Sequence, residues 1–124
     1  MATPNFIDAV IDGGLDYLAA NATRVHVCSS EPAAYANIAA AQLAVYTISG
    51  ANFTKANGDV SGRKITLGAQ TGAIAGAAGN GTHLAFSNGS STLYGVIAGD
   101  GDAISIGQQV DIAAVDVWEI RDPT

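Results

Sequence analysis

The stretch THLAFSNGSSTLYGVIA, residues 82–98, indicates the fold more directly than any other part of the sequence. In residues 82–87, large apolar side chains alternate with small or polar ones, which places Leu84 and Phe86 on one face, as in a strand that buries one side. Asn88-Gly89 is a strong hairpin signal because these two residue types favour tight turns between strands. The residues from 92 to 98 then supply the return strand. The stretch therefore predicts an antiparallel β-hairpin.

Similar segments on both sides of this hairpin predict further strands. Residues 24–29 alternate clearly, since Val25 and Val27 fall on one face and Arg24, His26 and Cys28 on the other. In chain order, strands are expected at Arg24–Ser29, Leu43–Ile48, Arg63–Leu67, Thr82–Ser87, Thr92–Ala98, Ala103–Ile106, Gln109–Ile112 and Ala114–Ile120. We therefore predict a mainly β fold, a β-sandwich or a small barrel, with short N-terminal helices.

The N-terminal residues carry helix signals. Thr3 is placed to cap a helix, and Pro4 stands at a favoured first helical position. The apolar residues that recur there at helical spacing are Phe6, Ile7, Val10 and Ile11. Gly13-Gly14 is expected to break this helix, and a further short turn is expected to end near Asn21. The Ala-rich stretch 31–44 also favours helix, although it has few large apolar anchors.

Length and composition fit a single folded domain. The 124 residues suffice to bury one core, and 48% of them are hydrophobic. We expect one domain over residues 1–124, with a helical segment (1–22) and a β-rich body (23–124). The net charge of -6 argues against nucleic acid and against an anionic membrane surface, because both are bound by clustered Lys and Arg. Neither a signal peptide nor a membrane span is predicted.

Charge is absent from a long internal tract. Residues 65–99 contain no Asp, Glu, Lys or Arg, although a soluble domain normally scatters charges over its surface. The tract is too rich in small polar residues to be core throughout, so part of it is expected to be covered by another chain. We therefore expect a homo-oligomer. The candidate interface residues are Phe6, Ile7, Val10, Leu84, Phe86, Tyr94 and Trp118.

Residues that carry chemistry are few. His26 and Cys28 would share a face of a strand, but zinc requires three or four ligands, so no metal site is predicted. No Gly-x-Ser-x-Gly nucleophile elbow occurs, and neither a catalytic residue nor a cofactor is expected. Asp100-Gly101-Asp102 lacks the later ligands of a calcium loop and is interpreted as a turn. Cys28, the single cysteine, is interpreted as a buried thiol, with a disulfide to a neighbouring subunit as the alternative.

Short motifs, mostly in the C-terminal half, resemble a known group of proteins. They are NFIDAV (5–10), the early strand that contains His26, NGTHLAF (80–86), STLY (91–94), GQQVDI (107–112) and WEIRDPT (118–124). In this order they resemble small virion proteins of tailed bacteriophages. The resemblance implies a capsid decoration (cement) protein on the virion surface, which binds and stabilises the lattice of the major capsid protein. Because head lattices often offer threefold positions, a trimer is the preferred oligomer.

Two other functions stay open at this stage. One is a tail- or fibre-associated module that binds receptor glycans, which requires exposed aromatic residues; Tyr35, Tyr46 and Trp118 are the candidates. The other is a small hydrolase, which requires His26 or His83 in a cleft beside an Asp and a Ser. The main hypothesis is a binding function with no chemical step.

Overall fold

The computed structural model describes residues 8–121 and confirms a mainly β fold with two short helices. The helices are α1 (Asp8–Asn21) and α2 (Ile38–Ala41), and short 3-10 turns occupy Tyr35–Asn37 and Gly50–Asn52. The strands are β1 (Arg24–Cys28), β2 (Gln42–Thr47), β3 (Phe53–Asn57), β4 (Arg63–Leu67), β5 (Gln70–Ile74), β6 (Gly79–Asn80), β7 (His83–Ser87), β8 (Leu93–Ala98), β9 (Ala103–Ile104), β10 (Gln109–Ile112) and β11 (Val115–Ile120). The predicted strands are present within a few residues, and β3, β5 and β6 are additional. The Ala-rich stretch contributes one four-residue helix, α2, before β2 begins.

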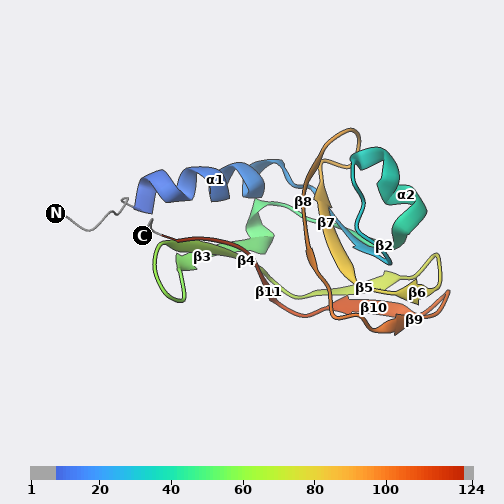
Figure 1. Cartoon of the computed structure of the whole chain (residues 1–124). Coiled ribbons are helices and arrows are strands. Elements are labelled where there is room, and N and C mark those ends of the chain that lie inside the picture. Colours follow the sequence, from blue (N-terminus) through green and yellow to red (C-terminus); the bar gives the residue numbers. More distant parts are fainter. Residues whose placement is uncertain (1–7, 122–124) are drawn as a thin grey trace.

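The largest sheet has four antiparallel strands in the order β2-β1-β7-β8 (Figure 1). The predicted hairpin is its β7–β8 half, with Leu84 opposite Ile97. β1 pairs with β7, and Val25 lies opposite Phe86. Both side chains are buried on the inner face of the sheet, as the alternating pattern predicts.

The loop of this hairpin is longer than the two-residue turn that Asn-Gly favours. The Oδ1 atom of Asn88 accepts hydrogen bonds from the backbone N–H groups of Ser90, Ser91 and Thr92. Gly89 has φ of 79°, but Asn88 does not take the left-handed conformation that a type I′ turn requires at both central positions. The Asn88 side chain therefore closes the turn through three hydrogen bonds.

A three-stranded sheet in the order β11-β4-β3 lies along α1 (Figure 1), and we call these four elements the charged layer. Arg63 Nε lies 3.0 Å from Asp12 Oδ1, which joins β4 to α1. Lys55 Nζ lies 2.5 Å from Asp16 Oδ1, which joins β3 to the same helix. Lys64 bridges two further carboxylates. Ion pairs thus hold the polar side of α1 to the sheet.

One hydrophobic core joins the two sheets. Its buried members are Leu15, Leu18, Ala22, Val25, Val27, Leu43, Ala44, Tyr46, Ile48, Ile65, Leu67, Ala75, Leu84, Phe86, Ile104, Val110 and Ile112. The pairs β5–β10 and β6–β9 lie together beside the four-stranded sheet (Figure 1). The buried Tyr46 hydroxyl donates to the carbonyl of Val110 and accepts from the N–H of Ala73, which ties β2 to β10 and β5. The arrangement is sandwich-like, and no barrel closes among the described residues.

The expected break at Gly13-Gly14 is wrong, because α1 runs without interruption to Asn21. Two glycines lower helix propensity by about 1 kcal/mol each relative to Ala. Leu15 and Leu18 follow them and are buried in the core, so tertiary packing outweighs this local cost. The expected cap at Thr3 and first turn at Pro4 lie outside the described residues.

Candidate functional site

An apolar groove opens where α1, β8 and β11 meet, and we call it the aromatic groove. Its volume is about 490 Å³. The residues that line it are Gly14, Tyr17, Leu18, Phe86, Tyr94, Gly95, Val96, Ile97, Val117 and Trp118. None of them is charged, although the chain as a whole carries a net charge of -6. The groove therefore differs from an ordinary acidic surface.

Three aromatic side chains form the open part of the groove. Tyr17 is 61% exposed and Trp118 is 46% exposed, whereas aromatic rings of this size are usually well buried. Tyr17 and Tyr94 pack edge to face, with ring centroids 6.1 Å apart and planes at 84°. Such edge-to-face contacts are favourable by about 0.5–1.5 kcal/mol and orient the two rings relative to each other. The groove is therefore lined by aromatic surface that water still reaches.

Gly14 allows α1 to approach Trp118 closely. A Cβ atom at position 14 would lie 3.3 Å from Cη2 and 3.4 Å from Cζ3 of the Trp118 ring. These separations are tighter than ordinary contacts between a Cβ atom and its neighbours. Gly14, which the sequence alone suggests as a helix breaker, thus allows α1 to form one wall of the groove against Trp118.

Both strands that border the groove are irregular where they line it. In β8, Tyr94 is an extra residue with no partner in β7. In β11, Val117 is an extra residue with no partner in β4. Such bulges bend a strand and redirect a side chain, and they are frequent at strand edges beside functional sites. Here the bulge in β8 places Tyr94 against Tyr17.

The structure separates the predicted interface residues into four groups. Leu84 and Phe86 are 5% and 1% exposed and belong to the chain's own core, and Phe86 also contributes to the lining of the aromatic groove. Tyr94 and Trp118 line the aromatic groove. Val10 is 60% exposed on α1. Phe6 and Ile7 lie outside the described residues. Sequence reasoning missed the groove residues Gly14, Tyr17, Gly95 and Val117.

A buried polar network surrounds His26 on the other face of the four-stranded sheet. Its Nδ1 lies 2.6 Å from Oε1 of Gln42, and its Nε2 lies 2.7 Å from Oγ of Ser87. Burial lowers the pKa of His26 below its ordinary value, and the nearby Arg24 lowers it further, against the opposing effect of the Gln42 hydrogen bond. In the neutral ring, Nδ1–H donates to Gln42 and Nε2 accepts from the Ser87 hydroxyl.

This network resembles the serine and histidine of a hydrolase in connectivity only. Ser87 is 0% exposed, so its hydroxyl is not accessible to a substrate in this structure. The third member is the neutral Gln42, whereas a carboxylate orients the histidine of a hydrolytic triad. His83 has a different partner, the hydroxyl of Thr82 at 2.8 Å from Nδ1. Among the residues that the structure describes, the side-chain hydrogen bonds of the two histidines involve Gln42, Ser87 and Thr82, and none of them involves an Asp.

Cys28 lies fully buried between the sheet and α2. It belongs to a small apolar cluster with Ile38, Ala41 and Ala85. Burial raises the pKa of the thiol to about 11, so the reactive thiolate is scarce at neutral pH. This position favours the buried-thiol interpretation over a disulfide between subunits.

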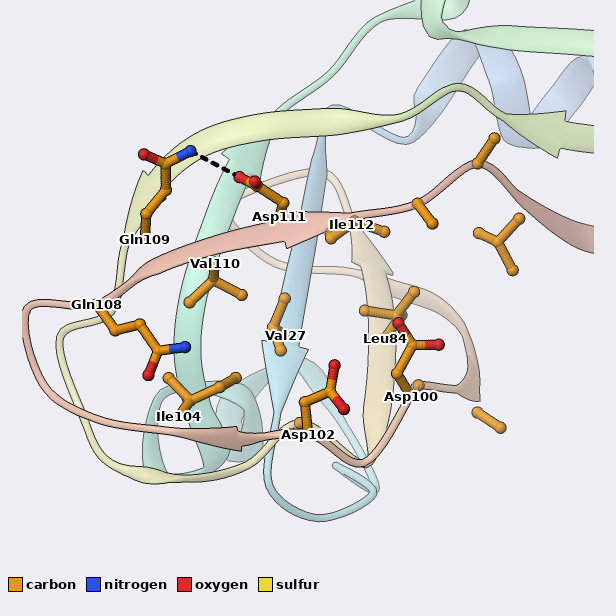
Figure 2. Close-up of a pocket in the computed structure, with 16 residues that line it drawn as sticks. Val27, Leu84, Asp100, Asp102, Ile104, Gln108, Gln109, Val110, Asp111 and Ile112 are labelled. Carbon is orange, nitrogen blue, oxygen red and sulfur yellow. Dashed lines mark hydrogen bonds between the residues drawn. The ribbon is translucent and has the colours of Figure 1, made fainter.

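A smaller hollow of about 160 Å³ lies between β9, β10 and the inner face of the four-stranded sheet (Figure 2). Val27, Leu84 and Val110 contribute apolar surface, and Asp100 and Asp102 lie near its rim (Figure 2). Within residues 8–121, no three His, Cys, Asp or Glu side chains gather closely enough to hold a metal ion.

Of the three aromatic residues considered for glycan binding, only Trp118 is prominently exposed. Tyr46 is 8% exposed and is engaged in the core, while Tyr35 is partly buried beside α2. In the structure, the aromatic residues that line the same groove as Trp118 are Phe86, Tyr17 and Tyr94, and not Tyr35 and Tyr46.

Comparison with protein-family models, with curated proteins and with solved structures finds no match. Neither helix of the described chain has the length and hydropathy that a helix needs to cross a bilayer.

Proposed function

We propose that this chain is a structural subunit of a bacteriophage virion that binds other protein chains through the aromatic groove. The observation that carries the proposal is the groove itself: exposed Tyr and Trp side chains on an uncharged, apolar surface. Protein interfaces are enriched in aromatic residues and depleted in charge at their centres, and Trp and Tyr dominate their binding energy. The function is binding, with no chemical step.

The resemblance to small virion proteins supports a more specific assignment as a capsid decoration protein that binds the major capsid protein. The acidic net charge suits a subunit on the outer surface, away from packaged DNA. A subunit that binds only the assembled lattice stabilises it by mass action. A trimer at threefold positions of the head is the preferred assembly.

Labelled protein added to heads that lack it provides the test. We expect electron microscopy to find the label at regular positions on the head, and co-sedimentation to saturate at a fixed number of copies per head. Trp118→Ser should weaken this binding, while Val60→Ser, at a position that is 74% exposed and outside the groove, should not. Label on tails alone, or no label on particles, would contradict the capsid assignment.

One observation favours a second candidate, a tail-associated module that binds receptor glycans. Tyr17, Tyr94 and Trp118 form a cluster of aromatic rings, and sugars stack on such rings. Against it, the groove contains no Asp, Asn, Glu or Gln, which are side chains able to bond several hydroxyl groups at once. Binding of free oligosaccharides that Trp118→Ser abolishes would establish this alternative.

A further inference from the structure

The strand β8 presents a free edge to the aromatic groove. Within the described residues β8 pairs only with β7, so the backbone groups on its other side have no strand partner. Four consecutive residues of β8, from Tyr94 to Ile97, line the groove. Val96 packs against the apolar cluster around Cys28 and Ile97 against the main core, so these two neighbours point to opposite faces of the sheet. Both line the groove, as expected where the strand edge faces it. The groove therefore exposes backbone hydrogen-bonding groups as well as aromatic rings.

Gly95 opens this edge to an incoming chain. A Cβ atom at position 95 would find no atom within 4 Å, so neither crowding nor packing inside the chain requires glycine there. Its φ is not in the left-handed region either. A glycine inside a strand is unfavourable and often marks a bulge, such as the one at the preceding Tyr94, or the close approach of another backbone. Gly95 lies opposite the inward-facing Phe86, so the missing side chain leaves room over the inner face of the sheet next to its free edge.

The chemistry of the groove restricts what fills it. Because no lining residue is charged, a charged side chain placed there would lose its hydration without gaining a partner. Unpaired N–H and C=O groups along β8 match the backbone of an extended peptide, which supplies the same groups at the same spacing. An uncharged extended peptide satisfies both conditions.

We propose that the aromatic groove binds an extended, uncharged segment of the partner protein, which pairs with β8 from Gly95 to Ala98 and adds a fifth strand to the four-stranded sheet. This inference rests on the proposed function, since it identifies how the virion partner is held. Trp118 and Tyr17 cover the added strand, and the bulge at Tyr94 sets the end of the pairing. The affinity comes from main-chain hydrogen bonds, and the aromatic rings select apolar side chains.

Hydrogen–deuterium exchange of the intact chain, free and bound to heads that lack it, tests the pairing. On binding, amides of β8 should exchange at least about tenfold more slowly, because the outer edge gains hydrogen-bond partners. Amides of β2, the other edge of the same sheet, should not change.

Gly95→Val should fill the groove and weaken binding to heads at least about tenfold. Valine favours strands, so the variant should fold at least as stably as the parent. Gly76→Val is the matched control, because a Cβ atom at position 76 would also find no atom within 4 Å, and this position lies outside the groove. The control variant should bind like the parent.

The outcomes separate the pairing from the proposed function. If the chain binds heads while β8 exchange and the affinity of Gly95→Val stay unchanged, the pairing is wrong and the virion function stands. If the parent chain does not bind heads, both fail. If β8 becomes protected in the free protein as its concentration rises, the occupant is a second copy and the partner assignment is overturned. Protection by free oligosaccharides instead of heads would likewise overturn it.

Discussion

In the charged layer, Lys55, Arg63 and Lys64 pair with carboxylates of neighbouring segments, whereas β7 and β8 of the four-stranded sheet contain no charged residue. The carboxylates that pair with Lys64, and Asp16 beside Lys55, are at least half exposed, and such pairs contribute little to stability, typically about 0–1 kcal/mol each. Apolar surface buried by both sheets, which includes Phe86 of the large sheet and Ile65 and Leu67 of the charged layer, contributes far more through the hydrophobic effect. The two regions therefore share one core and differ in the charge that they carry. The aromatic groove lies at their boundary, where an uncharged strand edge stays open to water.

The largest effect should come from the core of the four-stranded sheet. Phe86 is 1% exposed and its ring centroid lies 6.3 Å from that of Phe53. Phe86→Ala should lower the free energy of unfolding by about 3–5 kcal/mol, because it removes buried surface and leaves a cavity. Urea denaturation measures this change. Val60→Ala is the control and should stay within about 0.5 kcal/mol of the parent. Equal effects of the two changes would contradict the assigned core.

A smaller effect is expected where the two regions meet, at Trp118. Full burial of this ring in the sheet would give Trp118→Ala the cost of a core substitution. The ring is 46% exposed, so about half of its surface is already in water. We expect a loss of about 2 kcal/mol, roughly half of the value for a buried aromatic residue. A loss as large as that of Phe86→Ala in the same denaturation assay would show that the ring is buried.

Sequence patterning predicted the regular parts of this fold because alternation is a local property. The hairpin of β7 and β8 follows from the alternating residues around Asn88-Gly89. The continuity of α1 does not follow, because it depends on packing with elements distant in sequence. Gly14 faces Trp118, 104 positions further along the chain, and no local pattern predicts this contact. Strand β5 was missed because Gly72 and its small neighbours carry almost no apolar alternation.

The groove was harder to predict than the fold. Its lining comes from four elements, α1, β7, β8 and β11, and a single aromatic residue in each gives no sign that they meet. The bulges at Tyr94 and Val117 change which way these side chains point, and alternation assumes a regular strand. Gly95 within a predicted strand was the one available signal, since an isolated glycine there suggests a bulge or a close backbone approach.

The buried His26 network makes the stability of the four-stranded sheet depend on pH. Burial lowers the pKa of His26 in the folded chain below 6.5, so the unfolded chain binds a proton at this residue more readily than the folded chain does. The contribution of neutral His26 to stability is therefore complete above about pH 6.5. It decreases as the pH falls from 6.5 toward the lower folded-state pKa.

His26→Gln removes this titration and weakens the hydrogen bonds to Gln42 and Ser87. We expect it to cost about 1–2 kcal/mol at pH 7.5, the usual penalty for disturbing buried hydrogen bonds. The difference from the parent should narrow at pH 5, as urea denaturation at the two pH values will measure. A difference that stays constant, or grows, toward pH 5 would contradict a neutral buried imidazole.

The smallest effect should come from the charged layer, at Asp12. The hydrogen bond from Arg63 holds the pKa of this carboxyl below its ordinary value of 3.8, with Lys55 adding a weaker attraction. Because the folded-state pKa lies below that of the unfolded chain, the pair stabilises the fold above about pH 4. This contribution is lost as the pH falls through the folded-state pKa. Asp12→Asn should therefore cost at most about 1 kcal/mol at pH 7.

Two conditions should reduce this cost of Asp12→Asn. Acid protonates the carboxyl of the parent, and salt at about 1 M shortens the Debye length to about 3 Å and so screens the attraction between the two charges. Phe86→Ala should keep its full effect in the same salt, since burial of apolar surface does not depend on charge screening. Denaturation of both variants at low and high salt separates the two regions directly. If salt left the effect of Asp12→Asn unchanged, the ion pair with Arg63 would not be the source of the stability that Asp12 contributes. The charged layer would then not differ from the large sheet in its dependence on salt.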